Sequence, residues 1–367
     1  MRKLAVLTTT AAIALFGAAS AQNATAPAPR APAPQGPAAT AQGSTVQTSI
    51  HAYAAYHSDI GDLRGARVGN ANELERVLDI AARHNRDALS RGWIAYGAMT
   101  AAQSPAFVAG VREAAAHYGR DAVIRGMSVD PGWARLLRGG DEATRIVLNS
   151  ATADAARIIA VADRYRELAY GLQRQGWANA VAPQQAARVQ RIRGLSAGAL
   201  SVPPGDLAAR FNVMPVTLTP QTDPTVFGGR RFWDSVRGNG GVTEAASAAP
   251  GSWRVKPERG EAVNRMTTIA ALQALGAAES NPTLIDRLLN ESRSRDCLEM
   301  AQLQLFQCMS AARFRYENAF CMGQHALRDV GLCISGIAQP APAPGQAPLA
   351  AAQTPALASQ AISRPNQ

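Results

Sequence analysis

The sequence has few aromatic residues, almost no lysine and no cysteine before residue 297. Aromatic residues make up 5% of the chain and alanine is abundant, which predicts an all-α fold because aromatic side chains favour strands and alanine favours helices. The chain also lacks a phosphate-binding loop, a dinucleotide fingerprint and a cysteine-x-x-cysteine pair. We therefore expect no cofactor and no dithiol redox site.

Long apolar runs are also missing, except one from Leu4 to Phe16. Arg2 and Lys3 precede this run, and a small-x-small motif that ends at Ala21 follows it, so we expect a signal peptide cleaved after Ala21. The run is shorter than the roughly 20 residues of a membrane span, and no later run replaces it. We predict an exported chain, periplasmic or extracellular, with no transmembrane span after cleavage. No cysteine follows the cleavage site, so lipid attachment there is excluded.

The positive charge is almost entirely arginine, since only Lys3 and Lys256 are lysines. The formal charge is +10, and it falls to +8 when Arg2 and Lys3 leave with the signal peptide. Guanidinium groups present a planar fork that suits carboxylates and phosphates. The charge therefore predicts an envelope partner, either a protein or an anionic cell-wall or lipid polymer, and export makes nucleic acid an unlikely ligand. The alternative is that arginine and alanine only reflect a GC-rich genome.

Composition and periodicity divide the chain into six segments. In order they are a signal peptide (1–21), a disordered Pro/Ala-rich linker (22–44), a helical bundle (45–200), an irregular Pro/Gly-rich basic connector (201–260), a helical segment with four cysteines (261–336) and a disordered Pro/Ala/Gln-rich tail (337–367). The bundle contains two expected helix starts, Asn72 with Glu75 and Ser104 with Pro105.

The strongest helical pattern is an apolar stripe that begins after Gly140. Its members are spaced by three or four residues: Val147, Ala151, Ala155, Ile158, Ala162, Tyr165, Ala169 and Leu172. The alanines allow a partner helix to pack closely. We expect burial inside the chain's own bundle, and the alternative is a coiled-coil contact between two copies in a homo-oligomer.

The connector contains cations and aromatic residues in alternation. Arg230, Arg231, Trp233 and Trp253 form a candidate binding site, since this mixture suits carbohydrate stacking. The alternative interpretation is an ordinary loop that two buried tryptophans anchor to the core.

The four cysteines are nearly mirror-symmetric in sequence. Two antiparallel helices would pair Cys297 with Cys333 and Cys308 with Cys321. A helix starting at Asp296 places the first two cysteines on one face but about 16 Å apart, so they cannot bond each other. The last two are twelve residues apart, about 120° out of phase on an ideal helix, although Gly323 and Gly331 could distort it. The crossed pairing, first with third and second with fourth, therefore stays open.

This arrangement resembles the helical hairpins with paired cysteine-x9-cysteine motifs of small intermembrane-space proteins. The resemblance covers about forty residues, and here ten and eleven residues, rather than nine, lie between the paired cysteines. We interpret it as shared physics rather than kinship. The tight two-to-four-residue spacings of zinc sites are absent, so we expect structural disulfides and no metal.

Catalytic signals are few. Glu113 lies four residues before His117. Glu317 lies in the cross-linked segment, where we expect it to fix the hairpin turn by hydrogen bonds, and the alternative is that it lines a small groove with Arg313 and Tyr316. Glu299 is a third candidate acid. We expect a non-enzymatic exported structural or binding protein that presents a helical, arginine-rich surface to an envelope partner. The alternative is a cell-wall glycan hydrolase with a helix-rich, lysozyme-like site that uses one of these acids.

Overall fold

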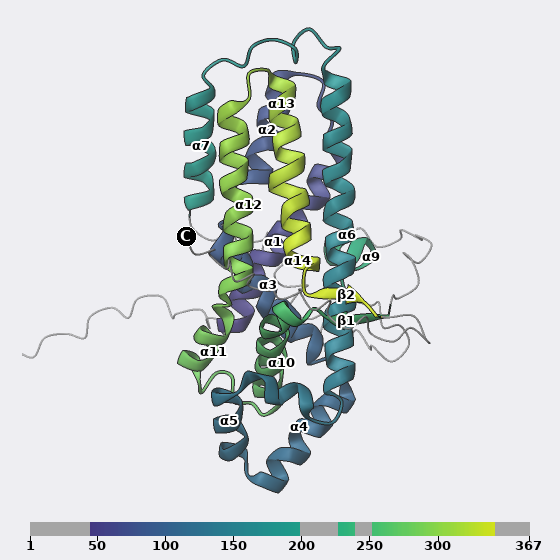
Figure 1. Ribbon diagram of the computed structural model, residues 1–367, viewed down its shortest axis with the longest axis vertical. Helices are drawn as coiled ribbons and strands as arrows, with labels where there is room; N and C mark the ends of the chain where they lie inside the picture. Colours follow the sequence, from purple (N-terminus) through teal and green to yellow (C-terminus); the bar gives the residue numbers. More distant parts are fainter. Residues whose placement is uncertain (1–44, 199–226, 239–251, 342–367) are drawn as a thin grey trace, which may run out of the picture. The chain divides into compact units, whose positions relative to one another are not determined.

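The computed structural model describes residues 45–198, 227–238 and 252–341 (Figure 1). These residues are mostly helical, as composition predicts. The helices are α1 (Thr45–Gly65), α2 (Ala71–Ala82), α3 (Arg86–Ala101), α4 (Pro105–Tyr118), α5 (Arg120–Val129), η1 (Pro131–Leu136), α6 (Gly140–Leu172), α7 (Gln185–Ala197), α9 (Gly229–Val236), η2 (Pro257–Arg259), α10 (Gly260–Ala274), α11 (Pro282–Leu289), α12 (Ser292–Ala311), α13 (Arg315–Cys321), η3 (Met322–Arg328) and α14 (Asp329–Ser335). The short strands β1 (Trp253–Val255) and β2 (Ala338–Pro340) pair antiparallel.

The predicted signal peptide, the linker at 22–44 and most of the connector lie outside the described residues, as does the predicted tail (337–367) beyond residue 341. The predicted start of this tail is too early, because Ile337 is buried and Ala338–Pro340 form β2. Within the described ranges, no helix is long and apolar enough to cross a membrane.

Helix α6 packs one face against the core. Every residue of the predicted stripe is buried, and the helix contacts α3, α9, α13, η3 and α14 (Figure 1). The stripe is thus covered by the chain's own helices, which is the first of the two interpretations of this pattern. Because α10 also packs on α3, the predicted bundle and the cysteine segment share one hydrophobic core.

The helix starts are only partly as predicted. Ser104 accepts a hydrogen bond from the backbone of Phe107, which confirms the start of α4. The predicted cap at Asn72 is wrong, because Asn70 caps α2 two residues earlier. Asn85 then caps α3. The helical spacing of apolar residues that runs through α2 and α3 in the sequence is therefore divided between two helices.

Many arginines cap the ends of neighbouring helices. The guanidinium of Arg120 donates to two carbonyls at the end of α10, that of Arg265 to carbonyls at the end of α11, and that of Arg164 to carbonyls at the end of α1. The last carbonyls of a helix have no partner within it, and a planar fork can reach two of them at once. This use accounts for part of the preference for arginine over lysine.

The cysteine segment is a helical hairpin of α12 against α13, η3 and α14, and it contains both predicted disulfides. Cys297 is bonded to Cys333 and Cys308 to Cys321, which settles the pairing that the sequence left open. The predicted helix start at Asp296 is wrong. The buried carboxylate of Glu291 caps α12 instead, by accepting from the backbone of Arg293 and Ser294.

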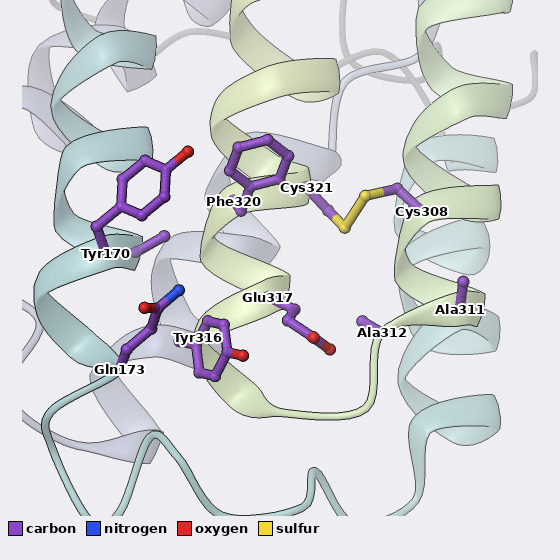
Figure 2. A pocket seen from close by; sticks show the side chains of 10 residues that line it. Tyr170, Gln173, Cys308, Ala311, Ala312, Tyr316, Glu317, Phe320 and Cys321 are labelled. Atoms are coloured by element: carbon purple, nitrogen blue, oxygen red, sulfur yellow. A yellow bond between two sulfur atoms is a disulfide. The ribbon is translucent and has the colours of Figure 1, made fainter.

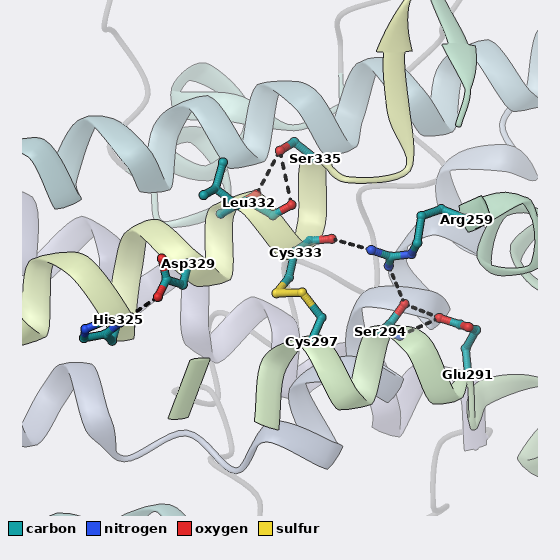
Figure 3. The surroundings of a disulfide bond; sticks show 10 residues. Arg259, Glu291, Ser294, Cys297, His325, Asp329, Leu332, Cys333 and Ser335 are labelled. Carbon is teal, nitrogen blue, oxygen red and sulfur yellow. Dashed lines mark hydrogen bonds and ion pairs between the residues drawn. A yellow bond between two sulfur atoms is a disulfide. The ribbon is translucent and has the colours of Figure 1, made fainter. Parts of the chain in front are cut away.

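Figure 3 shows how the outer disulfide is surrounded. Arg259 donates to the carbonyl of Cys333 and to the hydroxyl of Ser294, so one guanidinium links the two helices that the disulfide joins. The hydroxyl of Ser294 in turn donates to the carboxylate of Glu291.

A π-helical stretch resolves the phase error of Cys333. Residues Met322–Arg328 of η3 are π-helical and follow α13 without a break. A π-helix hydrogen-bonds i to i+5, so it absorbs one extra residue compared with an α-helix. Cys321 and Cys333 differ by twelve in residue number, and the π-helix absorbs one of these residues. Their spacing along the helix is then equivalent to the eleven-residue step from Cys297 to Cys308, so each cysteine faces its partner.

The connector is less irregular than predicted where it is described. Residues 229–236 form α9, and the indole of Trp233 is 1% exposed. Trp253 lies in β1 and is half-buried. The tryptophans therefore anchor the chain to the core, the second interpretation of this segment.

Candidate functional site

An open groove of about 370 Å³ lies where α6 ends and α13 begins (Figure 2). Its lining is mainly apolar: Ala169, Tyr170, Gln173, Cys308, Ala311, Ala312, Tyr316, Glu317, Phe320 and Cys321. Figure 2 shows Tyr170 and Gln173 projecting from α6, and Tyr316, Glu317 and Phe320 from the neighbouring helix α13. The volume is within the range of pockets that hold small ligands or single side chains of a partner.

Two features fix the walls of this groove. The Cys308–Cys321 disulfide joins α12 to α13 within the lining. The carboxylate of Glu317 accepts from the backbone N–H groups of Arg313 and Phe314, and so caps a connection that contains neither Gly nor Pro. The groove is therefore held by a covalent bond and by a helix cap.

Cations accompany the aromatic rings around the groove. The guanidinium of Arg166 lies over the ring of Phe320, 5.9 Å from its centroid. That of Arg313 lies 5.5 Å from the ring of Phe314, which stacks on Tyr316. Tyr170 is 58% exposed, so an apolar surface is open to a ligand beside positive charge. This combination suits a ligand that is anionic and partly apolar.

The three candidate acids are not brought together. Glu113 lies exposed on α4 and pairs with Arg138, and Glu299 lies exposed on α12 near Arg295. Only Glu317 lines the groove, and no second carboxylate is among its lining residues. Glycoside hydrolysis normally uses two carboxyl groups on either side of the bond. The groove thus fits binding better than that reaction.

A second cluster, which the sequence interpretation missed, is buried around Asp154 of α6. One carboxylate oxygen accepts from the backbone of Gly229 at 2.8 Å and from the indole of Trp233 at 2.6 Å. The other accepts from the hydroxyl of Tyr53 at 2.9 Å. Burial raises the pKa of Asp154 to about 7, although these three donors act in the opposite direction.

His57 lies beside this carboxylate. Its Nδ1 accepts from the guanidinium of Arg157 at 2.9 Å, so the ring proton is on Nε2, which is 3.8 Å from Asp154. Burial lowers the pKa of His57, and Arg157 lowers it further. The imidazole is therefore neutral near pH 7, and it stacks on the indole of Trp233 with 4.3 Å between centroids. All of these side chains are buried, so the cluster is closed to substrate in this structure.

The predicted binding residues of the connector do not form one surface. Trp233 is in the core, Arg231 is exposed, and Arg230 and Trp253 are half-buried. A binding role for Arg230, Arg231 and Trp253 stays a prediction. No group of His, Cys, Asp and Glu in the described ranges is arranged to hold a metal ion. Comparison with protein-family models, curated proteins and solved structures found no match to this chain.

Arg86, the first residue of α3, presents an unusual case. It is 2% exposed, and none of its three guanidinium nitrogens has a hydrogen-bond partner. Burying a charge that has no hydrogen-bond partner costs free energy, and an apolar side chain of similar size removes this cost. We expect Arg86→Met to leave the free energy of unfolding unchanged or to raise it by about 1–2 kcal/mol in urea titrations.

The matched control for Arg86 is Arg157→Met, which removes a buried guanidinium that is engaged with His57. Because this change also leaves the buried carboxylate of Asp154 without its nearby cation, we expect a loss of about 3 kcal/mol. A loss of similar size for Arg86→Met would show that Arg86 has a partner in solution, and would contradict the expectation.

Proposed function

We propose that this chain is an exported, non-enzymatic binding protein of the cell envelope, and that the groove between α6 and α13 binds an anionic, partly apolar partner. The observation that carries this proposal is the groove itself, which is lined by the exposed ring of Tyr170 and by the half-buried ring of Phe320, over which the guanidinium of Arg166 lies. The two disulfides are consistent with export, since such bonds persist in oxidising compartments.

The locations of the arginines show which of them can take part in the proposed binding at the groove. Many arginines are engaged with helix ends or with buried carboxylates, so total charge is a poor guide to the partner-binding face. Arg174 and Arg313 are exposed, and each directly follows a lining residue of the groove in the sequence. The guanidinium of Arg313 also lies over the ring of Phe314. These two cations are the ones that we expect an anionic group to meet first.

Cosedimentation with isolated envelope fragments tests the proposal. We expect the double variant Arg174→Gln, Arg313→Gln to bind roughly tenfold more weakly at low salt, because each exposed cation contributes about 0.5–1 kcal/mol. Tyr170→Ser should weaken binding at every salt concentration, because it removes an apolar contact that salt does not screen. The control is Arg125→Gln, Arg145→Gln, which removes the same charge from exposed positions on α5 and on the first half of α6.

Equal weakening by the control pair, or no sedimentation of the native chain at low salt, would overturn the proposal. We expect raised salt to weaken the binding of the native chain, and to weaken the binding of Arg174→Gln, Arg313→Gln by a smaller factor.

The glycan hydrolase alternative is favoured by one observation, the carboxylate of Glu317 in an aromatic-lined groove. A zymogram with purified cell wall separates the two proposals. We expect no clearing from the native chain. Clearing that Glu317→Gln abolishes would favour the hydrolase and would contradict a purely binding role.

A further inference from the structure

The short helix α9 buries the apolar side chains of Phe232 and Val236 and, between them in sequence, two adjacent side chains with polar groups, Trp233 and Asp234. Both are buried, at 1% and 2% exposed. The chain on either side of this stretch, 199–226 and 239–251, lies outside the described residues. A helix of eight residues is not stable alone in water, so α9 is ordered by what it contacts on α1, α3 and α6.

The indole of Trp233 is bound on several sides. One face lies parallel to the imidazole of His57, with 4.3 Å between centroids and 2° between planes. The rings of Tyr53 and Tyr96 lie 5.8 and 5.4 Å away by centroid. The indole N–H donates to Asp154 at 2.6 Å. The surroundings therefore select a flat aromatic ring that carries an N–H donor.

The carboxylate of Asp234 is bound next to it. Both terminal nitrogens of Arg64 donate to it, at 3.0 and 3.2 Å, and a nitrogen of Arg157 lies 3.9 Å away. A bidentate guanidinium contact with a buried carboxylate is strong and directional. The core thus places an aromatic cage and a carboxylate site side by side, in the order in which Trp233 and Asp234 follow each other.

Two glycines set the entry to α9. Gly228 and Gly229 have φ of +87° and +73°, and a Cβ on Gly228 would lie 2.5 Å from the carbonyl oxygen of Ser150. Gly229 also donates its N–H to Asp154. Alanine at 228 would therefore be both strained and in contact with the backbone of α6, which gives a specific way to release α9.

We propose that these core residues form a recognition site for a tryptophan–aspartate pair, which α9 fills within the chain and which a segment of another protein with the same pair fills when α9 leaves. The site consists of Tyr53, His57, Arg64, Tyr96, Asp154 and Arg157. It is separate from the groove and does not depend on the function proposed for it. The buried contacts of α9 are those of a bound peptide, an aromatic anchor beside a charge-paired carboxylate.

A peptide of residues 227–238, labelled with a fluorophore, tests the site by anisotropy. We expect it to bind full-length Gly228→Ala protein at least about tenfold more tightly than native protein, whose site is occupied. Peptides with Trp233→Ala or Asp234→Asn should bind at least about tenfold more weakly, and the exposed-position control Ser235→Ala should bind like the native peptide. Equal binding to both proteins, or equal binding of the Asp234→Asn peptide, would overturn the proposal.

A second variant covers the case in which Gly228→Ala does not fold. In Trp233→Ala protein, millimolar indole should refill the cage and raise the midpoint of thermal unfolding by about 2–4 °C. Native protein and the Trp253→Ala control should not respond to indole. No shift in Trp233→Ala would show that the cage does not take an aromatic ring from solution, and would overturn the proposal.

Discussion

Replacing Asp154 with leucine is expected to lower the free energy of unfolding by about 4 kcal/mol, whereas asparagine at this position should be tolerated. Leucine leaves the N–H groups of Gly229 and Trp233 and the hydroxyl of Tyr53 without an acceptor in the core, at about 1–3 kcal/mol for each group that finds no other partner. Asparagine keeps the oxygen that two of these donors share, and its amide can donate to Tyr53. Urea titrations of the full chain at pH 5 and pH 8 measure both changes.

The pH dependence of the unfolding free energy, compared between native protein and Asp154→Asn, isolates the effect of the charge on Asp154. Because burial raises its pKa from 3.8 to about 7, the folded protein disfavours the ionised carboxylate, and the contribution of this group is present below about pH 4 and lost as the pH rises to about 7. Asparagine does not titrate. The stability of Asp154→Asn relative to native protein should therefore rise by about 1.4 kcal/mol per pH unit between about pH 4 and 7, and then stay constant.

Two other buried groups that can titrate, His57 and His84, are present in both native protein and Asp154→Asn. The neighbours of Asp154, which are Arg157, Tyr53 and Tyr96, are also the same in both. The difference in unfolding free energy between the two proteins therefore reports chiefly on Asp154. A stability difference that is flat from pH 4 to pH 8 would show that the donors around this carboxylate outweigh its burial.

Removing the Cys297–Cys333 disulfide is the other change with a large expected effect. It closes 36 residues, and loop-closure entropy in the unfolded chain gives about 4 kcal/mol, against about 3 kcal/mol for the 13 residues between Cys308 and Cys321. We expect Cys297→Ser, Cys333→Ser to be less stable than native protein by about that amount in urea titrations without reductant.

The inner pair supplies the control for this experiment. Cys308→Ser, Cys321→Ser should lose slightly less stability and should loosen the lining of the groove, which hydrogen exchange of residues 308–321 would show. Native protein that unfolds at the same urea concentration with and without reductant would contradict both expectations.

The sequence predicts the helical architecture and both disulfides because these depend on local periodicity and on spacing. It indicates that Gly323 and Gly331 could distort the last helix, but it does not predict the π-helical form of η3, which packs against α6. A Cβ on Gly323 would lie 3.0 Å from the carbonyl oxygen of Ala162, so a glycine there permits a close approach that no periodicity reports. The hydrogen bonds of Glu317 that fix the hairpin turn are confirmed, since its carboxylate accepts from the backbone N–H groups of Arg313 and Phe314.

The groove and the buried cluster could not be assembled from the sequence. Tyr170 and Tyr316 meet only because α6 and α13 pack together, far apart as they are along the chain. Asp154 and Arg157 carry a signal, because each is a charged residue directly before a member of the apolar stripe of α6, Ala155 and Ile158. Their partners on α1 and α9 depend on tertiary packing, so the residues that stabilise the charge could not be named in advance.

Hydrogen exchange of the full chain with and without envelope fragments tests the proposed binding role most directly. The account predicts slower exchange in the last turn of α6 and in residues 312–321, with α4 and α5 unchanged, and loss of this protection in Arg174→Gln, Arg313→Gln. Protection confined to α4 and α5, or protection at the groove that survives in the double variant, would contradict it.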